Sequence, residues 1–455
     1  MARLTEYHKK WIRRQPRFGG IFENGQGFEK RIRLSGAQAY DEEAEYIKKA
    51  VENGCDGAQR EQLAEEIAAY TKKRSAVPLS SGTAAMHLAV KLAAEKQYGS
   101  ASGISTPDGL GKEGSLYKRR VFVSDFAPMS LAGPVLYEGG EPIFVDCGDG
   151  DWGMDPEVLR IAFEKYTDVK IVIANDAYGY PGRLSKIRKI CNEHGAILIM
   201  DASESLGAEA LFPYQERSLP LPTPMFADYA VLDFGKGRII SGDGGGVLLS
   251  DDPYSARKAE YWAEGAYADA PWAQHSELGY DYRMGDLTAA MIRGQLSHVG
   301  EIIEKKKKIY ERYREKLDGE LAYMIPVGED ARPNYWMSAM TCESSIVFEE
   351  TRDSRNYTYR DTHGTAAPME IIEALQAFGA EALPLYKPLS MQPIFVNHEH
   401  VTLDGFRRTY EDFYCDNFSL KCHRAKQYFQ SGVCLPGDIG MTEEEQDKVM
   451  EIVLA

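Results

Sequence analysis

The sequence lacks the features of several protein classes. Its 455 residues include 7 cysteines, an odd number, and none of them form a C-x-x-C pair. This argues against a disulfide scaffold or a zinc site and favours a reducing compartment. No stretch approaches the roughly 18 apolar residues of a membrane span. The basic N-terminal segment also has no apolar core of the kind found in secretory signals. We therefore expect a cytoplasmic protein.

Positive charge is also scarce. The 53 Lys and Arg residues are outnumbered by 69 Asp and Glu residues, which gives a net charge of −16. Such a surface repels nucleic-acid phosphates, so a nucleic-acid partner is not expected. No group of His, Cys and Asp has the spacing of metal ligands, and no metal is expected. Because 44% of the residues are hydrophobic, the chain can bury a large core, and its length suggests two domains.

Strand-like and helical stretches alternate along the first 300 residues. A helical pattern covers 41–70, with a glycine break inside it. Further on, the apolar runs VKIVIAN (169–175) and AILIMDAS (196–203) flank the helical run at 184–195. Near-continuous apolar strands are typical of parallel sheets that are buried on both faces. The fold class is therefore α/β, with a mostly parallel sheet covered by helices on both sides.

Composition suggests where the domains begin and end. Residues 1–35 are polar and unpatterned and are interpreted as an N-terminal arm. The large domain then covers 36–300, with a Gly- and Ser-rich surface insertion at 99–116. A helix at about 299–317 is expected to lead into a smaller α+β domain, so that 301–455 holds the linking helix and the C-terminal domain.

Three short segments carry chemistry. Ser81, Gly82 and Thr83 stand where a strand or turn enters a helix, and free backbone N–H groups, the helix dipole and two hydroxyls can cradle a phosphate there. Asp201 ends an apolar strand and could keep a pyridine nitrogen protonated. Lys236 precedes a Gly-rich turn, where an amine could form a Schiff base. The alternatives are an ordinary helix cap, a capping Asp and a solvated loop lysine.

The order of these segments resembles the DegT/DnrJ family of sugar-nucleotide aminotransferases, which depend on pyridoxal 5′-phosphate (PLP). The resemblance runs from about Arg33 to the C-terminus and is carried by several ordered matches, among them SSGTAAMHLA, VLYEGGEPIFVD, YGYPGRLSKIRKICNEHGAILIMDASESLGA, LGYDYRMGDLTAAMIRGQL, KPLSMQPIF and GVCLPGDIGMT.

The resemblance implies a fold and a reaction. The fold would be that of the PLP-transferases (fold type I), with a three-layer α/β/α large domain. Asp201 would face the pyridine nitrogen, Glu204 would face the ring's 3-oxygen or the substrate, and Ser81, Gly82 and Thr83 would bind the phosphate. The substrate would be a nucleotide-linked keto sugar of surface-glycan biosynthesis, and an amino acid would donate the nitrogen. Since family sites form between subunits, a homodimer or a heteromer with a paralogue is implied.

The lysine position departs from the family pattern. Counted from Phe234 and the Gly-rich turn, the family's lysine falls at Arg238, which is always protonated and cannot form a Schiff base. Lys236 lies two residues earlier and could serve only if the loop takes another route. The serine that helps to hold the phosphate in the family is Asp233 here.

Three more positions differ. The aromatic residue that stacks on the pyridine ring falls at Pro128, and an arginine expected before PLYKP is Leu383. The asparagine that reaches the partner's phosphate is Asp286. An Asp beside a phosphate dianion is repulsive by about 1 kcal/mol or more at 4 Å, depending on burial.

Three functions remain open from the sequence. The first is a PLP-dependent aminotransferase in which Lys236 forms the Schiff base and Arg238 binds an anion. The second is a non-catalytic paralogue that binds or completes an active partner. The third is a sugar dehydratase that works without the lysine, although Arg238 is too basic for that proton transfer. His87, on an apolar helix, is expected to be a core histidine, His275 is expected to be structural or at an interface, and Trp336 is expected to have a packing role.

Overall fold

The structure is a computed structural model of the full chain. It describes residues 4–22, 25–36, 39–99, 114–215, 217–319, 322–342, 346–351, 357–362, 368–395, 397–408 and 423–455. Of the expected surface insertion at 99–116, positions 100–113 lie outside these ranges. None of the described helices is long and apolar enough to cross a membrane.

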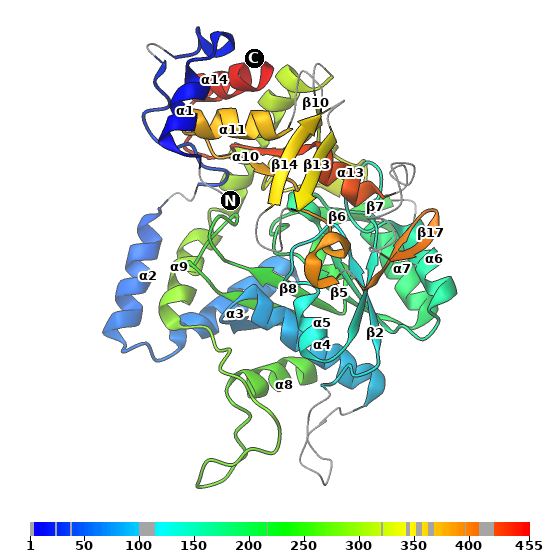
Figure 1. Ribbon diagram of the computed structural model, residues 1–455. Helices are drawn as coiled ribbons and strands as arrows, with labels where there is room; N and C mark the ends of the chain where they lie inside the picture. The colour runs from blue at the N-terminus through cyan, green and yellow to red at the C-terminus, as the bar shows by residue number, and fades with distance from the viewer. Residues whose placement is uncertain are drawn as a thin grey trace.

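A large mixed sheet forms the centre of the molecule (Figure 1). Its strand order is β1-β9-β8-β5-β4-β2-β3-β16-β17, and the neighbours from β8 to β16 run parallel. The expectation of a mostly parallel α/β sheet is confirmed. The strands are β1 (Ser75–Leu79), β2 (Arg120–Ser124), β3 (Glu141–Val145), β4 (Ile171–Asn175), β5 (Ile197–Asp201), β8 (Tyr229–Asp233), β9 (Gly246–Ser250), β16 (Glu399–Thr402) and β17 (Gly405–Arg408).

Side chains alternate along the strands and pack into two separate cores. Along β5, Ile197 and Ile199 belong to one core, whereas Leu198 and Met200 belong to the other. The period of two therefore places apolar groups on both faces of the sheet, and helices cover both, giving three layers. One face carries α4 (Gly82–Tyr98), α5 (Gly133–Tyr137) and α8 (Pro253–Ala263); the other carries α3 (Ala58–Thr71), α6 (Pro156–Lys165), α7 (Leu184–His194) and α9 (Asp286–Leu296).

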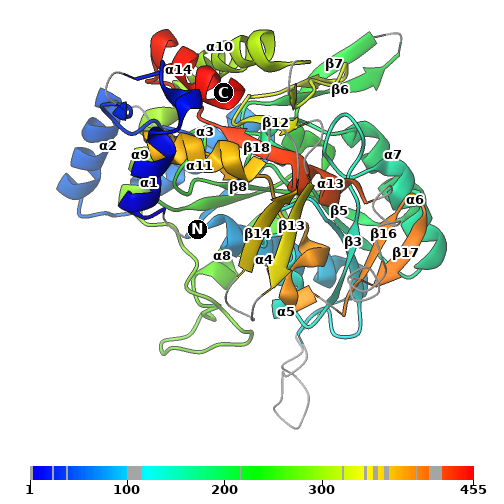
Figure 2. The same ribbon diagram turned by 45° about the horizontal axis from the view of Figure 1, so that its top comes forward.

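A second, smaller region follows the long helix α10 (Val299–Leu317), whose bounds agree with the expected linking helix. Its antiparallel sheet has the order β10-β12-β18-β15. A hairpin of β6 and β7 extends beside it with β11, and β13 pairs with β14 (Figure 2). The elements are β6 (Glu209–Tyr214), β7 (Arg217–Pro222), β10 (Ala322–Met324), β11 (Ala331–Arg332), β12 (Ser338–Cys342), β13 (Ile346–Thr351), β14 (Tyr357–Thr362), β15 (Leu383–Pro384), β18 (Gly432–Leu435), α11 (Pro368–Phe378), α13 (Arg424–Ser431) and α14 (Glu443–Leu454).

The N-terminal segment is more ordered than its composition indicated. It forms α1 (Glu6–Arg13), which lies beside α11 and α14 in Figure 1. Arg13 donates a hydrogen bond to the carbonyl of Ala377, and the N–H of Phe28 donates to the carbonyl of Phe378 at 2.8 Å. The arm is therefore packed on the C-terminal region. After it, α2 (Asp41–Glu52) and α3 are separated at the predicted glycine break.

Candidate functional site

The site is built where β1 ends and α4 begins. The hydroxyl of Ser81 caps α4 by accepting from the N–H of Ala84 at 3.1 Å. The N–H of Gly82 donates to Oδ1 of Asp233, at the end of β8, at 3.2 Å. A Cβ on Gly82 would lie 2.5 Å from the Cβ of Asp233, so only glycine permits this approach. The anion at this helix N-terminus is therefore a carboxylate of the chain itself, and Thr83 lies half-buried beside it.

Arg238 links two acidic groups. Its Nε donates to Oδ2 of Asp233 at 2.9 Å, and one of its terminal nitrogens donates to Oε1 of Glu204 at 3.2 Å. The guanidinium is only 17% exposed, so solvent screens these pairs weakly. Although burial opposes the charge, Glu204 and then Asp233 raise the pKa of Arg238 above its ordinary value. Arg238 is thus a fixed cation inside the site.

An aromatic stack supports the loop that carries Arg238. The guanidinium lies 4.8 Å from the ring centre of Trp336, and the indole N–H of Trp336 donates to the carbonyl of Gly237 at 2.7 Å. Tyr178 stacks on Trp336 at 6.4 Å and on Tyr386 at 4.8 Å. Tyr178 has φ +59, an uncommon conformation for a residue other than glycine. Trp336 therefore fixes the loop through a hydrogen bond and a cation–π contact, which is more than the packing role expected for it.

Glu204 is the hub of the site. Its Oε2 accepts from the N–H of Tyr178 at 2.7 Å, and its Oε1 accepts from Arg238 and from the hydroxyl of Tyr386. The carboxylate is buried. Sequence reasoning missed Tyr178 and Tyr386, although Tyr178 lies in the matched segment YGYPGR; their positions on facing segments cannot be read from spacing.

Asp201 lies at the carboxyl end of β5, as expected, and is buried. Its Oδ1 accepts from the N–H of Ser203 at 3.0 Å. Burial raises the pKa of Asp201 to about 6, so the group is mostly ionised at pH 7. Directly after the neighbouring strand β4, Asp176 is also buried, and burial raises its pKa to about 7. Sequence reasoning did not single out Asp176.

Lys236 lies apart from this network. It is exposed in the loop between β8 and β9, whereas Arg238, two residues later, is turned into the site. Among the described residues, no hydrogen bond or ion pair is formed by the Lys236 amine. The structure therefore brings Asp201, Glu204, Arg238 and the Ser81–Thr83 turn into one region and leaves the amine at its edge.

Three other positions were expected to depart from the family pattern. Asp286 and Pro128 have structural roles, and Leu383 makes no contact within the described part of the chain that explains its identity. Asp286, at the start of α9, caps α3: its carboxylate accepts from the N–H groups of Gly57 at 3.3 Å and Arg60 at 2.9 Å. Its charge thus faces a helix N-terminus, which stabilises it. The carbonyl of Pro128 accepts from the N–H of Leu131 in the turn before α5. Leu383 is partly exposed in β15.

The two histidines have the structural roles expected for them. His87 is buried in α4, with its Nε2 at 2.8 Å from Glu138 and its Nδ1 at 3.1 Å from the Tyr282 hydroxyl. Nδ1 of His275 donates to the carbonyl of Gly265, in the same loop, at 2.7 Å. Neither faces Glu204 or Arg238.

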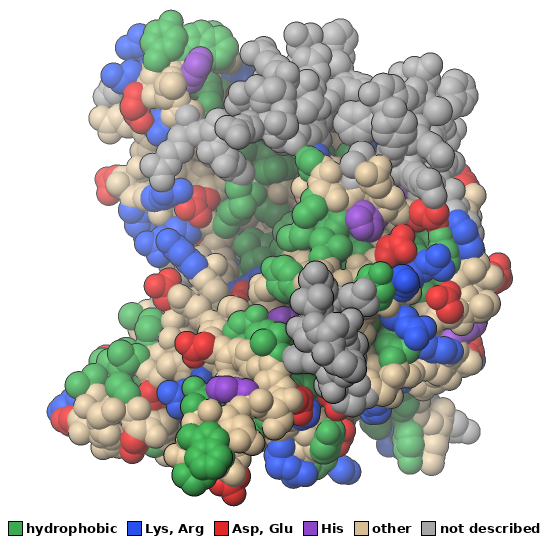
Figure 3. Space-filling view, turned by 60° about the horizontal axis from the view of Figure 1, so that its bottom comes forward, with side chains coloured by type: hydrophobic (Ala, Val, Ile, Leu, Met, Phe, Trp, Pro, Cys, Tyr) green, Lys and Arg blue, Asp and Glu red, His purple; other side chains and the backbone are tan. Residues whose placement is uncertain are grey.

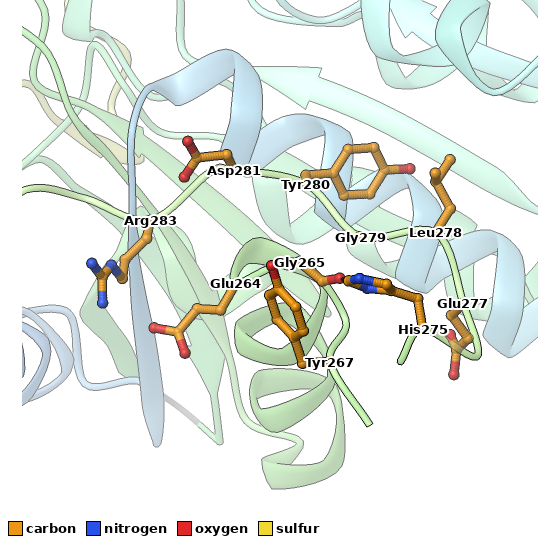
Figure 4. Close-up of a pocket in the computed structure, with 10 residues that line it drawn as sticks. All are labelled: Glu264, Gly265, Tyr267, His275, Glu277, Leu278, Gly279, Tyr280, Asp281 and Arg283. Carbon is orange, nitrogen blue, oxygen red and sulfur yellow. The ribbon is translucent and has the colours of Figure 1, made fainter. Parts of the chain in front are cut away.

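His275 lines a cavity of about 730 Å³ at the base of the extended loop after α8 (Figure 4). Its lining carries charges of both signs, from Glu264, Glu277, Asp281 and Arg283. Figure 3 shows hydrophobic side chains exposed on this end of the molecule; on this loop Tyr267, Trp272 and Leu278 are all more than half exposed.

A second buried charged cluster joins the C-terminal region to the sheet. His423 Nε2 lies 2.7 Å from Oδ2 of Asp125, which follows β2. Asp146, after β3, accepts from the N–H groups of Arg424 and Ala425 at the start of α13. All three acidic and imidazole side chains come within 4.8 Å of one another. Both oxygens of Asp125 and of Asp146 accept hydrogen bonds from protein groups, and the protonated imidazole of His423 forms a buried ion pair with Asp125.

Comparison with known proteins defines the family. The model of the DegT/DnrJ/EryC1/StrS aminotransferase family matches residues 38–454. The chain belongs to this family. EpsN of Bacillus subtilis (strain 168), provisionally named a pyridoxal phosphate-dependent aminotransferase, is 29% identical over 93% of this chain and 95% of its own. GDP-perosamine synthase of Vibrio cholerae is 26% identical over 85% of this chain and 96% of its own.

Solved structures agree on the fold. The PLP form of Spr1654 from Streptococcus pneumoniae, provisionally described as a sugar aminotransferase, superposes with a TM-score of 0.71 at 16% identity, covering 92% of this chain and 97% of that one. A form with pyridoxamine phosphate has also been solved. The aminotransferases of this family depend on PLP, so the cofactor class and the fold type that the resemblance implied are confirmed for the family.

The residues of this chain fit the two ends of PLP unequally. The buried, mostly ionised Asp201 suits a protonated pyridine nitrogen. At the other end, the N–H of Gly82 is already used by Asp233, so a phosphate fits only where that carboxylate moves aside. The chain's own residues could therefore hold the ring, with the phosphate end in competition with Asp233.

Proposed function

We propose that this family member transfers an amino group to a nucleotide-linked keto sugar in the synthesis of surface polysaccharides, with an amino acid as donor. The single observation that carries the proposal is the buried carboxylate of Asp201 at the carboxyl end of β5, in a chain that matches the family from residue 38 to 454. The relative GDP-perosamine synthase makes an amino sugar linked to a nucleotide, which supports this substrate class.

PLP, when bound, supplies an electron-withdrawing ring through which the amino group passes from donor to acceptor. In this chain Asp201 would accept a hydrogen bond from the ring nitrogen and hold the proton there. Glu204, anchored by the N–H of Tyr178, would orient the Tyr386 hydroxyl toward the bound groups. Lys236, whose amine is the nearest in sequence to Arg238, would turn from the exposed side of the loop into the site, hold the cofactor there and carry a proton on its Nζ.

A second function is favoured by a specific observation. Arg238 stands at the family's lysine position and is held by Asp233, Glu204 and Trp336. A guanidinium so engaged cannot form a Schiff base. This arrangement suits a non-catalytic subunit that binds or completes an active paralogue.

The test is chemical attachment of the cofactor. The purified protein is mixed with PLP, reduced with borohydride and digested, and the labelled peptide is identified by mass spectrometry. For the aminotransferase we expect label on Lys236, loss of label in Lys236→Ala, and retention in the control Lys186→Ala, which removes another exposed lysine. A separate sample that is loaded with PLP but not reduced is assayed with keto-sugar nucleotides and glutamate, because reduction makes the attachment irreversible and abolishes turnover. If no lysine is labelled, the aminotransferase proposal fails and the partner-subunit function replaces it.

The assembly is proposed to be a dimer of this chain. The extended loop after α8 projects from the body in Figure 1 and exposes Tyr267, Trp272 and Leu278. Exposed aromatic and aliphatic groups of this kind are typical of subunit contacts. Light scattering after size-exclusion chromatography is expected to give twice the chain mass of 50.9 kDa. A mass equal to one chain would reject the homodimer and direct the search to a paralogous partner.

A further inference from the structure

We infer that the Asp233 carboxylate is an internal competitor for the place at the start of α4 that the phosphate of PLP would take, and that Arg238 holds this competitor in place. The inference rests on the proposed function only in its choice of cofactor. Asp233 affects how strongly the phosphate is bound, and this effect does not depend on which residue attaches PLP covalently.

The geometry of Asp233 resembles that of a bound anion. Its Oδ1 receives the N–H of Gly82, the first residue of α4, and the glycine allows the carboxylate to lie directly against the helix end. The positive end of the helix dipole stabilises a negative charge there. The Ser81 hydroxyl is meanwhile occupied by the N–H of Ala84. The turn expected to bind phosphate is thus satisfied without one.

Arg238 fixes the competitor from the other side. Its Nε binds the second oxygen of Asp233, Oδ2, so both carboxylate oxygens are engaged. The same guanidinium is tied to Glu204 and lies on Trp336. A phosphate could bind at the start of α4 only if the Asp233 carboxylate moved away from the N–H of Gly82. That movement would also break or lengthen its hydrogen bond with Arg238.

The effect is specific to one end of the cofactor. A phosphate dianion next to an ionised Asp233 is repelled, and it must also displace the hydrogen bond at Gly82. The pyridine ring would be held by Asp201, which is on a different strand from Asp233, and would not be subject to this competition. Asp233 should therefore weaken binding of PLP and leave binding of pyridoxal, which has no phosphate, unchanged.

Asp233→Asn tests this because it removes the charge and keeps the shape. The dissociation constants of PLP and of pyridoxal are measured by calorimetry in a Lys236→Ala background, so that covalent attachment does not contribute. We expect Asp233→Asn to tighten PLP binding by at least about tenfold, which corresponds to about 1.4 kcal/mol, with no change for pyridoxal. Asp243→Asn, which removes an exposed charge from the same loop, is the matched control and should change neither constant.

Three results would overturn the inference: equal PLP affinity with and without Asp233, equal tightening of PLP and pyridoxal, or no PLP binding by either variant. Asp233→Ser serves as a second neutral variant, and thermal melting confirms that each protein is folded. Failure of the proposed function is a separate result, since it would appear as absent labelling or absent amination while the difference between PLP and pyridoxal remained.

Discussion

At the residue scale, a guanidinium and an amine lie two positions apart in one loop, and only the guanidinium is turned into the site. Arg238 cannot lose its proton, and it is bound to Asp233 and Glu204 at 2.9 and 3.2 Å. Lys236 keeps an amine in the same loop, but on its exposed side. Substitutions that remove the lysine at position 236 and introduce one at position 238 can decide which of the two positions faces the cofactor.

Arg238→Lys in a Lys236→Ala background is expected to restore attachment of PLP, at position 238. The reason is that a lysine there starts from the same buried backbone position and can be deprotonated, whereas arginine cannot. The measurement is borohydride reduction followed by peptide mapping, with Arg238→Gln in the same background as the control that has no amine. Absence of label in a folded Arg238→Lys protein would place the reactive carbon of the cofactor away from this residue.

The residues that matter most here were only partly accessible from the sequence. Asp201 and the Ser81–Thr83 turn follow from a strand end and a helix start, because parallel strands bring their carboxyl ends to one edge, whereas Glu204 was implied only by the family resemblance. Trp336 and Tyr386 could not be assigned, since they reach the site from the small region through contacts more than 90 positions apart in the chain. The family resemblance placed Asp233 near the phosphate, but it did not indicate the hydrogen bond from Gly82 to this carboxylate.

At the scale of elements, the large sheet was predictable and its closure by the C-terminal region was not. Continuous apolar runs identify β4 and β5, and the helix α10 follows from its own periodicity. The contact between His423 and Asp125 joins residues 298 positions apart in the chain, so no local sequence pattern predicts it. This pair pins the start of α13 to the end of β2.

The His423–Asp125 pair predicts a pH-dependent stability. Burial alone would lower the pKa of His423, but the charge of Asp146 and the hydrogen bond to Asp125 raise it. Burial opposes ionisation of Asp125, and the hydrogen bond from His423 nevertheless lowers its pKa. The histidine's contribution is fully present below its unfolded pKa of about 6.5 and is lost as pH rises through the raised value. The contribution of Asp125 is lost as pH falls through the lowered value.

His423→Gln should therefore destabilise the protein most between about pH 4 and pH 6.5, by about 3 kcal/mol because a buried charge loses its partner. His400, which stacks on His423 at 4.9 Å, stays in place in this variant. Urea denaturation at pH 6 and pH 9 measures the difference, which should shrink at the higher pH. His8→Gln, in exposed α1, is the control; a penalty that is the same at both pH values would show that packing rather than charge is responsible.

At the scale of the whole molecule, one buried lysine connects three parts of the chain. Lys306, in α10, donates to the Ser35 hydroxyl at 2.9 Å, to the carbonyl of Trp336 at 3.0 Å and to the carbonyl of Gly437 at 2.9 Å. It thus ties the N-terminal segment to the small region and to the residue that supports Arg238. Burial lowers the pKa of Lys306 to about 7, well below its ordinary value of 10.5.

This shift makes the stability of the assembled regions rise with pH. Between about pH 7 and pH 10.5 the unfolded chain binds more protons at Lys306 than the folded chain does, so folding becomes more favourable as pH increases. Below pH 7 both states are protonated and the contribution is flat. Relative to Lys306→Met, the wild-type protein should gain up to about 1.4 kcal/mol of unfolding free energy per pH unit from pH 7 to pH 9.

The comparison is made by urea denaturation at pH 7, 8 and 9, with Lys308→Met as the matched control, since Lys308 is exposed on the same helix. The control should differ from wild type by the same amount at every pH. A flat difference for Lys306→Met as well would mean that Lys306 stays charged in the folded state. In that case the three oxygen atoms around it, from Ser35, Trp336 and Gly437, solvate the ammonium well enough to offset its burial.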